Sequence, residues 1–216
     1  MVASGFCEAH EPITTKLTWT REISRIFYKR CIGCHREGGR APMSLVIYEE
    51  ARPWAKAIKE EVLERRMPPW GAVKGFGEFR NDTSLSEREI ELIAEWVEGG
   101  APKGEDVYLP PTPNLAPKEE PPMAPLQRLP VSDGVPLKRD LVAVGVLPSE
   151  APMQVTAQLP DGTVQPLVWV RDRRPEGPAA YYFREPLRLP KGARIRVGTP
   201  IAQKQSSSVV LLVRTR

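Results

Sequence analysis

Histidine is scarce in this sequence of 216 residues, and its scarcity excludes several kinds of catalytic site. His10 and His35 are the two histidines, so residues 36–216 contain no imidazole. Copper in proteins favours several nitrogen ligands with a soft sulfur, and a Ser-His-Asp set needs an available histidine. We therefore expect no copper site and no serine-hydrolase set in the C-terminal part of the chain.

Long apolar runs and dense basic tracts are also missing. No stretch of about 18 apolar residues occurs, so we expect no membrane span. Lys and Arg form no dense run interleaved with aromatics, so nucleic acid is not an expected partner. Residues 1–108 carry 16 basic and 18 acidic residues (−2), whereas residues 109–216 carry 15 and 9 (+6). A solvated basic surface explains this excess, and docking of an acidic partner is the alternative.

Cysteine is rare too, but two of the three cysteines belong to a motif. Cys31-Ile32-Gly33-Cys34-His35 has the C-x-x-C-H spacing of haem c attachment sequences. Two thiols at this spacing reach the two vinyl groups of one porphyrin, and the next residue places an imidazole on the iron. We expect one covalently bound haem c, with thioether bonds to Cys31 and Cys34 and with His35 as the proximal iron ligand.

The cysteine pair has three weaker interpretations. One is a chance match to the motif. A structural zinc site needs four ligands, and Cys7 and His10, far upstream, are the remaining Cys and His residues. A thioredoxin-like redox pair follows a strand, whereas the residues before Cys31 have the apolar spacing of a helix.

The iron of such a site needs a sixth ligand or an open position. Met67 lies 32 residues after His35, on a loop followed by Pro68, which suits a ligand that returns over the other haem face. Met43 lies eight residues after His35, which leaves little chain to pass around the porphyrin. We expect Met67 to be the distal ligand; Met43, or a core role for Met67 at a helix end, are the alternatives.

Aromatic residues near the motif are expected to line the haem pocket. Tyr48, Trp54 and Trp70 are the candidates, and a simple core role is the alternative for each. Arg40 and Arg52 could reach the haem propionates, although exposed arginines are common in any protein.

Apolar periodicity divides the chain into a helical part and a strand-forming part. Helices are expected over residues 20–31, over 53–66 and from a capping box at Ser86 to Gly99. Eight prolines between residues 110 and 130 indicate a semi-rigid linker. About seven short strands follow, with a hairpin at Asp161-Gly162; they include residues 141–147, 153–159, 167–170, 181–183, 187–197 and 209–213.

Several short sequence motifs occur together in the helical part. They are Trp19…Arg21-Glu22-Ile23, Cys31-x-x-Cys34-His35, Ala41-Pro42-Met43-Ser44-Leu45, Ala51-Arg52-Pro53-Trp54-Ala55, Met67-Pro68-Pro69-Trp70, Asn81-Asp82, Leu85-Ser86 and Trp96-Val97-Glu98-Gly99-Gly100-Ala101-Pro102. In this combination, residues 18–108 resemble the c-type cytochrome domains of acidobacterial and planctomycete proteins. The resemblance covers about two fifths of the chain, and it implies that Met67 is the distal ligand.

A second resemblance concerns the C-terminal part. The stretch 182–195 is similar to a strand pair in the C-terminal sandwich of copper type II, ascorbate-dependent monooxygenases, which often accompany such cytochrome domains. That family binds copper through several His and a Met, and this chain has no histidine after His35. A related sandwich would have lost its copper site.

The expected fold is α + β in two domains. A small all-α, class I-like cytochrome c domain would occupy residues 18–108, and an all-β antiparallel sandwich residues 131–216. Residues 109–130 would be the Pro-rich linker. Residues 1–17 would be an N-terminal segment that carries the remnant of an export signal. Because bacteria attach haem c outside the cytoplasm, the motif implies a periplasmic or otherwise extracytoplasmic protein.

The expected function is electron transfer to and from redox partner proteins, without catalysis of a reaction. The β domain would dock a partner or stabilise the cytochrome. The alternatives are a peroxidase-like haem enzyme with a labile sixth ligand, an electron-feeding component or fusion remnant of a copper monooxygenase-like enzyme, and a β module that binds an extracytoplasmic ligand.

Overall fold

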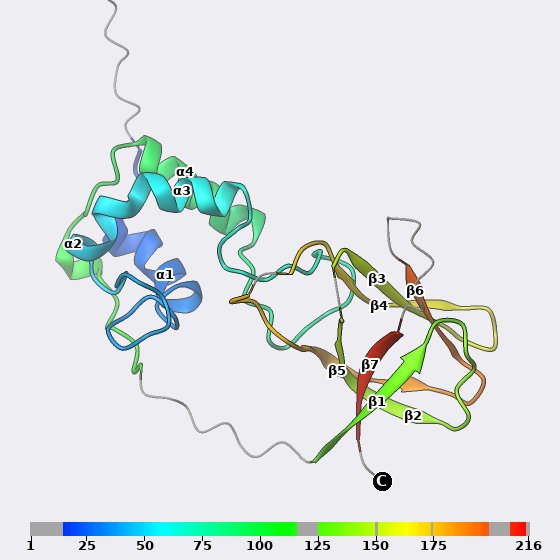
Figure 1. Cartoon of the computed structure of the whole chain (residues 1–216). Coiled ribbons are helices and arrows are strands. Elements are labelled where there is room, and N and C mark those ends of the chain that lie inside the picture. Colours follow the sequence, from blue (N-terminus) through cyan, green and yellow to red (C-terminus); the bar gives the residue numbers. More distant parts are fainter. Residues whose placement is uncertain (1–14, 116–124, 150, 174, 199–207, 215–216) are drawn as a thin grey trace, which may run out of the picture. The chain divides into compact units, whose positions relative to one another are not determined.

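The computed structural model describes residues 15–115, 125–149, 151–173, 175–198 and 208–214, and it combines helices with antiparallel sheets. The chain divides into two compact units (Figure 1). Met1–Pro68 with Ser84–Ala116 form the helical unit, and Pro69–Thr83 with Pro117–Arg216 form the β unit. No helix in the described ranges has the length and apolarity that crossing a bilayer requires.

The first two expected helices are present in the helical unit, with shifted ends. The π-helix η1 (Trp19–Ile23) continues into α1 (Ser24–Arg30), over the range expected at 20–31. The second helix begins earlier than expected, because α2 (Tyr48–Ala51) and the 3-10 turn η2 (Arg52–Trp54) lead directly into α3 (Ala55–Leu63). It also ends earlier, because Arg65 adopts a left-handed backbone with φ 55°.

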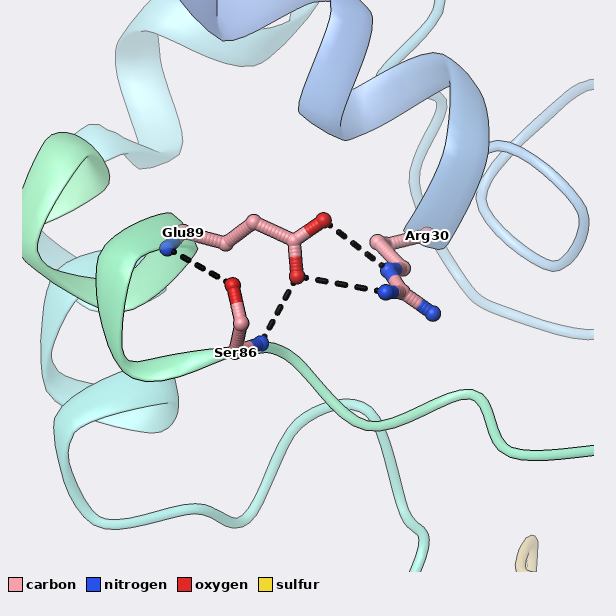
Figure 2. A network of polar contacts seen from close by, with 3 residues as sticks. All are labelled: Arg30, Ser86 and Glu89. Atoms are coloured by element: carbon pink, nitrogen blue, oxygen red, sulfur yellow. Dashed lines mark hydrogen bonds and ion pairs between the residues drawn. The ribbon is translucent and has the colours of Figure 1, made fainter. Parts of the chain in front are cut away.

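The third helix, α4 (Glu87–Glu98), begins at the expected capping box. The Oγ atom of Ser86 accepts a hydrogen bond from the N–H of Glu89, and the Glu89 carboxylate accepts one from the N–H of Ser86, at 3.1 and 2.7 Å (Figure 2). Two of the N–H groups that a helix start leaves unpaired are thereby satisfied. A short 3-10 turn, η3 (Asp106–Tyr108), follows α4.

Aromatic rings form the centre of the helical unit. Trp19 and Trp96 are fully buried and contact each other and Phe27, with ring centroids 5.0 to 6.3 Å apart. Tyr48 adds an edge contact to Trp19 and donates its hydroxyl hydrogen to the carbonyl of Ala101 at 2.9 Å. Each such ring pair adds roughly 0.5–1.5 kcal/mol beyond its burial. The cluster therefore joins η1, α1, α2 and α4.

The described residues of the β unit form seven strands in two antiparallel sheets (Figure 1). The strands are β1 (Leu126–Ser132), β2 (Leu141–Leu147), β3 (Met153–Gln158), β4 (Val164–Val170), β5 (Tyr181–Leu189), β6 (Arg194–Gly198) and β7 (Ser208–Arg214). One sheet has the order β1-β7-β2-β5 and the other β4-β3-β6. Side chains from both sheets share one core, to which Val146 and Leu211 contribute from the first and Val155 and Ile195 from the second.

Local signals placed most strands correctly, but several boundaries differ; β4, for example, begins at Val164 rather than at residue 167. The hairpin at Asp161-Gly162 joins β3 to β4, and Gly162 has the positive φ of 88° that such a turn needs. Residues 187–197, expected as one strand, belong to β5 and β6 with a turn between them. Strand β1 occupies residues expected in the linker and includes Pro130, which is tolerated because β1 lies at a sheet edge.

Residues 69–83 belong to the β unit, although the sequence suggested a continuous cytochrome domain over 18–108. Ala72 forms a bridge to Val170 of β4, and Phe79 forms one to Phe183 of β5. Because β4 and β5 are edge strands, the segment pairs with one open edge of each sheet. Trp70 and Phe79 are each 5% exposed and belong to the β core, which explains the assignment.

Candidate haem attachment site

The C-x-x-C-H residues form one helical turn directly after α1. The N–H of Cys31 donates to the carbonyl of Phe27 at 2.8 Å, which extends the hydrogen bonding of α1 by one residue. The N–H groups of Cys34 and His35 both donate to the carbonyl of Cys31, at 3.1 and 3.0 Å. The two thiols and the imidazole therefore project from a single turn of backbone.

The loop after the motif folds back onto it. The N–H of Ala41 donates to the carbonyl of Cys34 at 3.2 Å, and the N–H of Leu45 donates to that of His35 at 3.0 Å. Gly39 approaches so closely that a Cβ atom there would lie 2.2 Å from the carbonyl oxygen of Cys34. The position accepts only glycine without a shift of backbone, and the loop restrains the attachment turn.

His35 has a buried imidazole nitrogen. Its Nδ1 atom is buried and forms no hydrogen bond of normal geometry within the described residues. Burial lowers the pKa of His35, and the nearby backbone of Met43 opposes this shift only in part. A neutral imidazole is the form that binds metal ions. The surroundings of His35 therefore favour the protonation state that iron ligation requires.

The two thiols of the motif are partly buried and form no disulfide. Burial, with smaller contributions from the Cys34 thiol and Glu89, raises the pKa of Cys31 to about 12, against the opposing charge of Arg30. Arg40 Nε donates to Cys34 Sγ at 3.0 Å. Redox-active cysteines act as thiolates, so the raised pKa disfavours the thioredoxin-like alternative for Cys31. Within the described ranges, no three His, Cys, Asp or Glu side chains cluster as they would around a metal ion.

An ion pair fixes the end of α1, where the attachment turn begins. Arg30, the last residue of α1, donates from Nε and Nη2 to the two carboxylate oxygens of Glu89 in α4, at 3.2 and 3.3 Å (Figure 2). Both side chains are 16% exposed, and the same carboxylate also completes the capping box of α4. A two-point guanidinium–carboxylate contact adds geometric specificity to its strength. It therefore positions the backbone just before Cys31 against α4.

The two methionine candidates have different surroundings. Met67 follows α3 in the helical unit, where its N–H donates to the carbonyl of Glu61, and it is 37% exposed. Met43 lies in the loop after the motif and packs, partly buried, against the helical core. The exposed thioether of Met67 contributes little to the core, so the structure does not support the interpretation of Met67 as a core residue.

The three aromatic residues expected to line the haem pocket lie in different parts of the fold. Tyr48 is partly buried and directs its hydroxyl to the carbonyl of Ala101, whereas Trp54 ends η2 and is 45% exposed. Trp70 lies in the core of the β unit, where its ring meets the Tyr181 ring edge-on at 5.0 Å and its carbonyl accepts the Tyr181 hydroxyl hydrogen at 2.9 Å. A core role therefore accounts for Trp70.

Sequence reasoning missed two features of this site. The first is the structural support of the attachment turn. The Arg30–Glu89 ion pair joins residues that are distant in the sequence, and Gly39 lies in an irregular loop. The second is a set of large apolar side chains that the helical unit leaves exposed between residues 47 and 67: Ile47, Trp54, Leu63 and Met67. Apolar residues at helix ends resemble core residues in a sequence, so their exposure has no local signal.

Compared as a whole with known proteins, the chain matches no family model, no curated protein and no solved structure.

Proposed function

We propose that the helical unit is a c-type cytochrome domain with one covalently bound haem, and that the protein transfers electrons. The complete attachment sequence, folded as one helical turn, carries this proposal. Cys31 and Cys34 would form the thioether bonds, His35 would be the proximal ligand and Met67 the distal ligand. When bound, haem c supplies a one-electron iron couple, whose potential is raised by His/Met ligation.

The residues of the helical unit fit this group. Burial lowers the pKa of His35, which favours the neutral imidazole that binds iron. Burial raises the pKa of the Cys31 thiol, which disfavours a thiolate poised for disulfide exchange. Exposed apolar side chains such as Trp54 and Leu63 offer surface that a porphyrin could cover.

The proposed ligands also favour electron transfer over catalysis. With His35 and Met67 both bound to the iron, no position remains open for peroxide, which disfavours the peroxidase-like alternative. The β unit would then dock a redox partner or stabilise the cytochrome domain. Since bacteria attach haem c outside the cytoplasm, we place the protein in the periplasm or another extracytoplasmic compartment.

Covalent attachment is the direct test. The full chain should be exported in a bacterial strain with cytochrome c maturation, and its denatured form examined on a gel stained for haem. We expect a stained band for the wild type and for Cys7→Ala, and none for the Cys31→Ala/Cys34→Ala double variant. Haem that acid acetone extracts from the wild-type protein would contradict the proposal.

A further inference from the structure

A pocket of about 580 Å³ opens at one end of the four-stranded sheet of the β unit. All four strands contribute, because β1 and β2 begin at this end and β5 and β7 finish there. The segment that enters β2 and the turn after β5 complete the lining. No residue of the attachment motif takes part, so the pocket is independent of the function proposed above.

Three arginines from separate segments line this pocket: Arg139 before β2, Arg188 on β5 and Arg214 on β7. Arg188 lies opposite Val142, on the other side of β2 from the strand that carries Arg214. All three are exposed, and none forms an ion pair with another described residue. The contact of Arg139 is with Gln127 Oε1, at 3.5 Å. Three guanidinium groups around one cavity create a strongly positive potential.

The carboxylate in the lining offsets only one of these three positive charges. Asp140 Oδ1 accepts a hydrogen bond from the N–H of Lys191 at 2.7 Å, which joins the turn after β5 to the segment entering β2. The N–H of Leu137 donates to the carbonyl of Ala193, and the N–H of Gly192 donates to that of Leu137, at 2.8 and 2.9 Å. These hydrogen bonds hold the segment that enters β2 against the turn after β5. The three arginines and one aspartate of the lining leave a net charge of +2.

We propose that this pocket binds a small organic or inorganic polyanion, of the polycarboxylate or polyphosphate class. Guanidinium groups bind carboxylates and phosphates through paired N–H···O bonds. The volume falls in the range of roughly 300–1,000 Å³ that small-molecule sites occupy. Leu141 and Leu189 line the same pocket with apolar surface that a short carbon skeleton can contact.

Isothermal titration calorimetry on the purified full chain tests this proposal. Citrate, pyrophosphate and acetate would be titrated at one ionic strength, set with chloride, since nonspecific attraction depends on salt. We expect saturable one-to-one binding of citrate or pyrophosphate and none of acetate; the polyanion bound more tightly identifies the ligand class. No saturable binding of either polyanion overturns the proposal.

Variants locate the site. Arg188→Gln and Arg214→Gln should each weaken binding by at least about tenfold, because each removes a charged hydrogen-bond donor. Arg171→Gln is the control with the same change of charge, since Arg171 is exposed after β4 and outside the lining. Within the described residues, the side chains of Arg188 and Arg214 form no ion pair and both are exposed, so their variants should unfold at the wild-type temperature. Equal weakening by all three variants would show general charge attraction and refute the site.

Discussion

Replacement of Trp70 by alanine tests the place of residues 69–83 in the fold. The indole is 5% exposed, and its ring contacts those of Phe79 and Tyr181 at centroid distances of 5.8 and 5.0 Å. Truncation of a buried Trp to Ala costs roughly 3–5 kcal/mol through lost burial and the cavity left behind. We expect a loss of about 4 kcal/mol, which is a large part of the roughly 5–15 kcal/mol that stabilises a domain.

We expect this loss of unfolding free energy to appear in the β unit. Urea unfolding followed by the far-UV signal of the strands measures it, and the haem absorption spectrum under native conditions should stay unchanged. Trp54→Ala is the matched control: its indole is 45% exposed, so we expect a loss below about 1 kcal/mol but an altered haem spectrum. A loss below about 1 kcal/mol for Trp70→Ala, together with a changed haem spectrum, would refute the assignment of Trp70 to the β core.

Two further predictions concern the helical unit. Met67→Ala should abolish the weak near-infrared band of methionine–iron ligation and allow carbon monoxide to bind, whereas Met43→Ala should do neither; the reverse pattern would assign the ligand to Met43. Burial raises the pKa of Glu89, but the capping-box hydrogen bonds and Arg30 outweigh it and lower the pKa below its ordinary value of 4.5. Because the folded pKa is the lower one, this carboxylate stabilises the fold above about pH 4.5, and the contribution is lost as the pH falls through the lowered pKa. Glu89→Gln should therefore lower the free energy of unfolding by about 1–2 kcal/mol at pH 7, and the stability of this variant should fall less steeply in acid. Glu91→Gln is the control, because Glu91 belongs to an exposed ion pair with Arg88; we expect it to change the free energy of unfolding by less than about 0.5 kcal/mol at either pH.

Features with a local cause could be predicted from the sequence. The capping box at Ser86 and the hairpin at Asp161-Gly162 each depend on residues within one turn, and both are present. The ion pair between Arg30 and Glu89 joins residues 59 positions apart, so no window of the sequence contains it. The close approach of Gly39 to the attachment turn likewise depends on how a loop without periodicity folds back.

The Met67-Pro68-Pro69-Trp70 motif shows why a domain boundary can be hard to recognise in a sequence. Its four residues suggest one structural unit, yet the division falls after Pro68. Residues 69–83 have no strand periodicity, and their assignment depends on two edge strands, β4 and β5, that come about a hundred residues later. Only the tertiary fold supplies those partners.

This boundary leads to a last prediction, because Met67 and Trp70 are three residues apart in the chain. Three residues span at most about 11 Å, so the proposed iron ligand is tethered closely to a core residue of the β unit. Unfolding of the β unit would release that tether, whereas the thioether bonds would keep His35 beside the iron. During urea unfolding, the near-infrared band should therefore disappear together with the strand signal, and in Trp70→Ala both should shift to the same lower urea concentration. A band that survives the loss of the strand signal would show that Met67 is held by the helical unit alone.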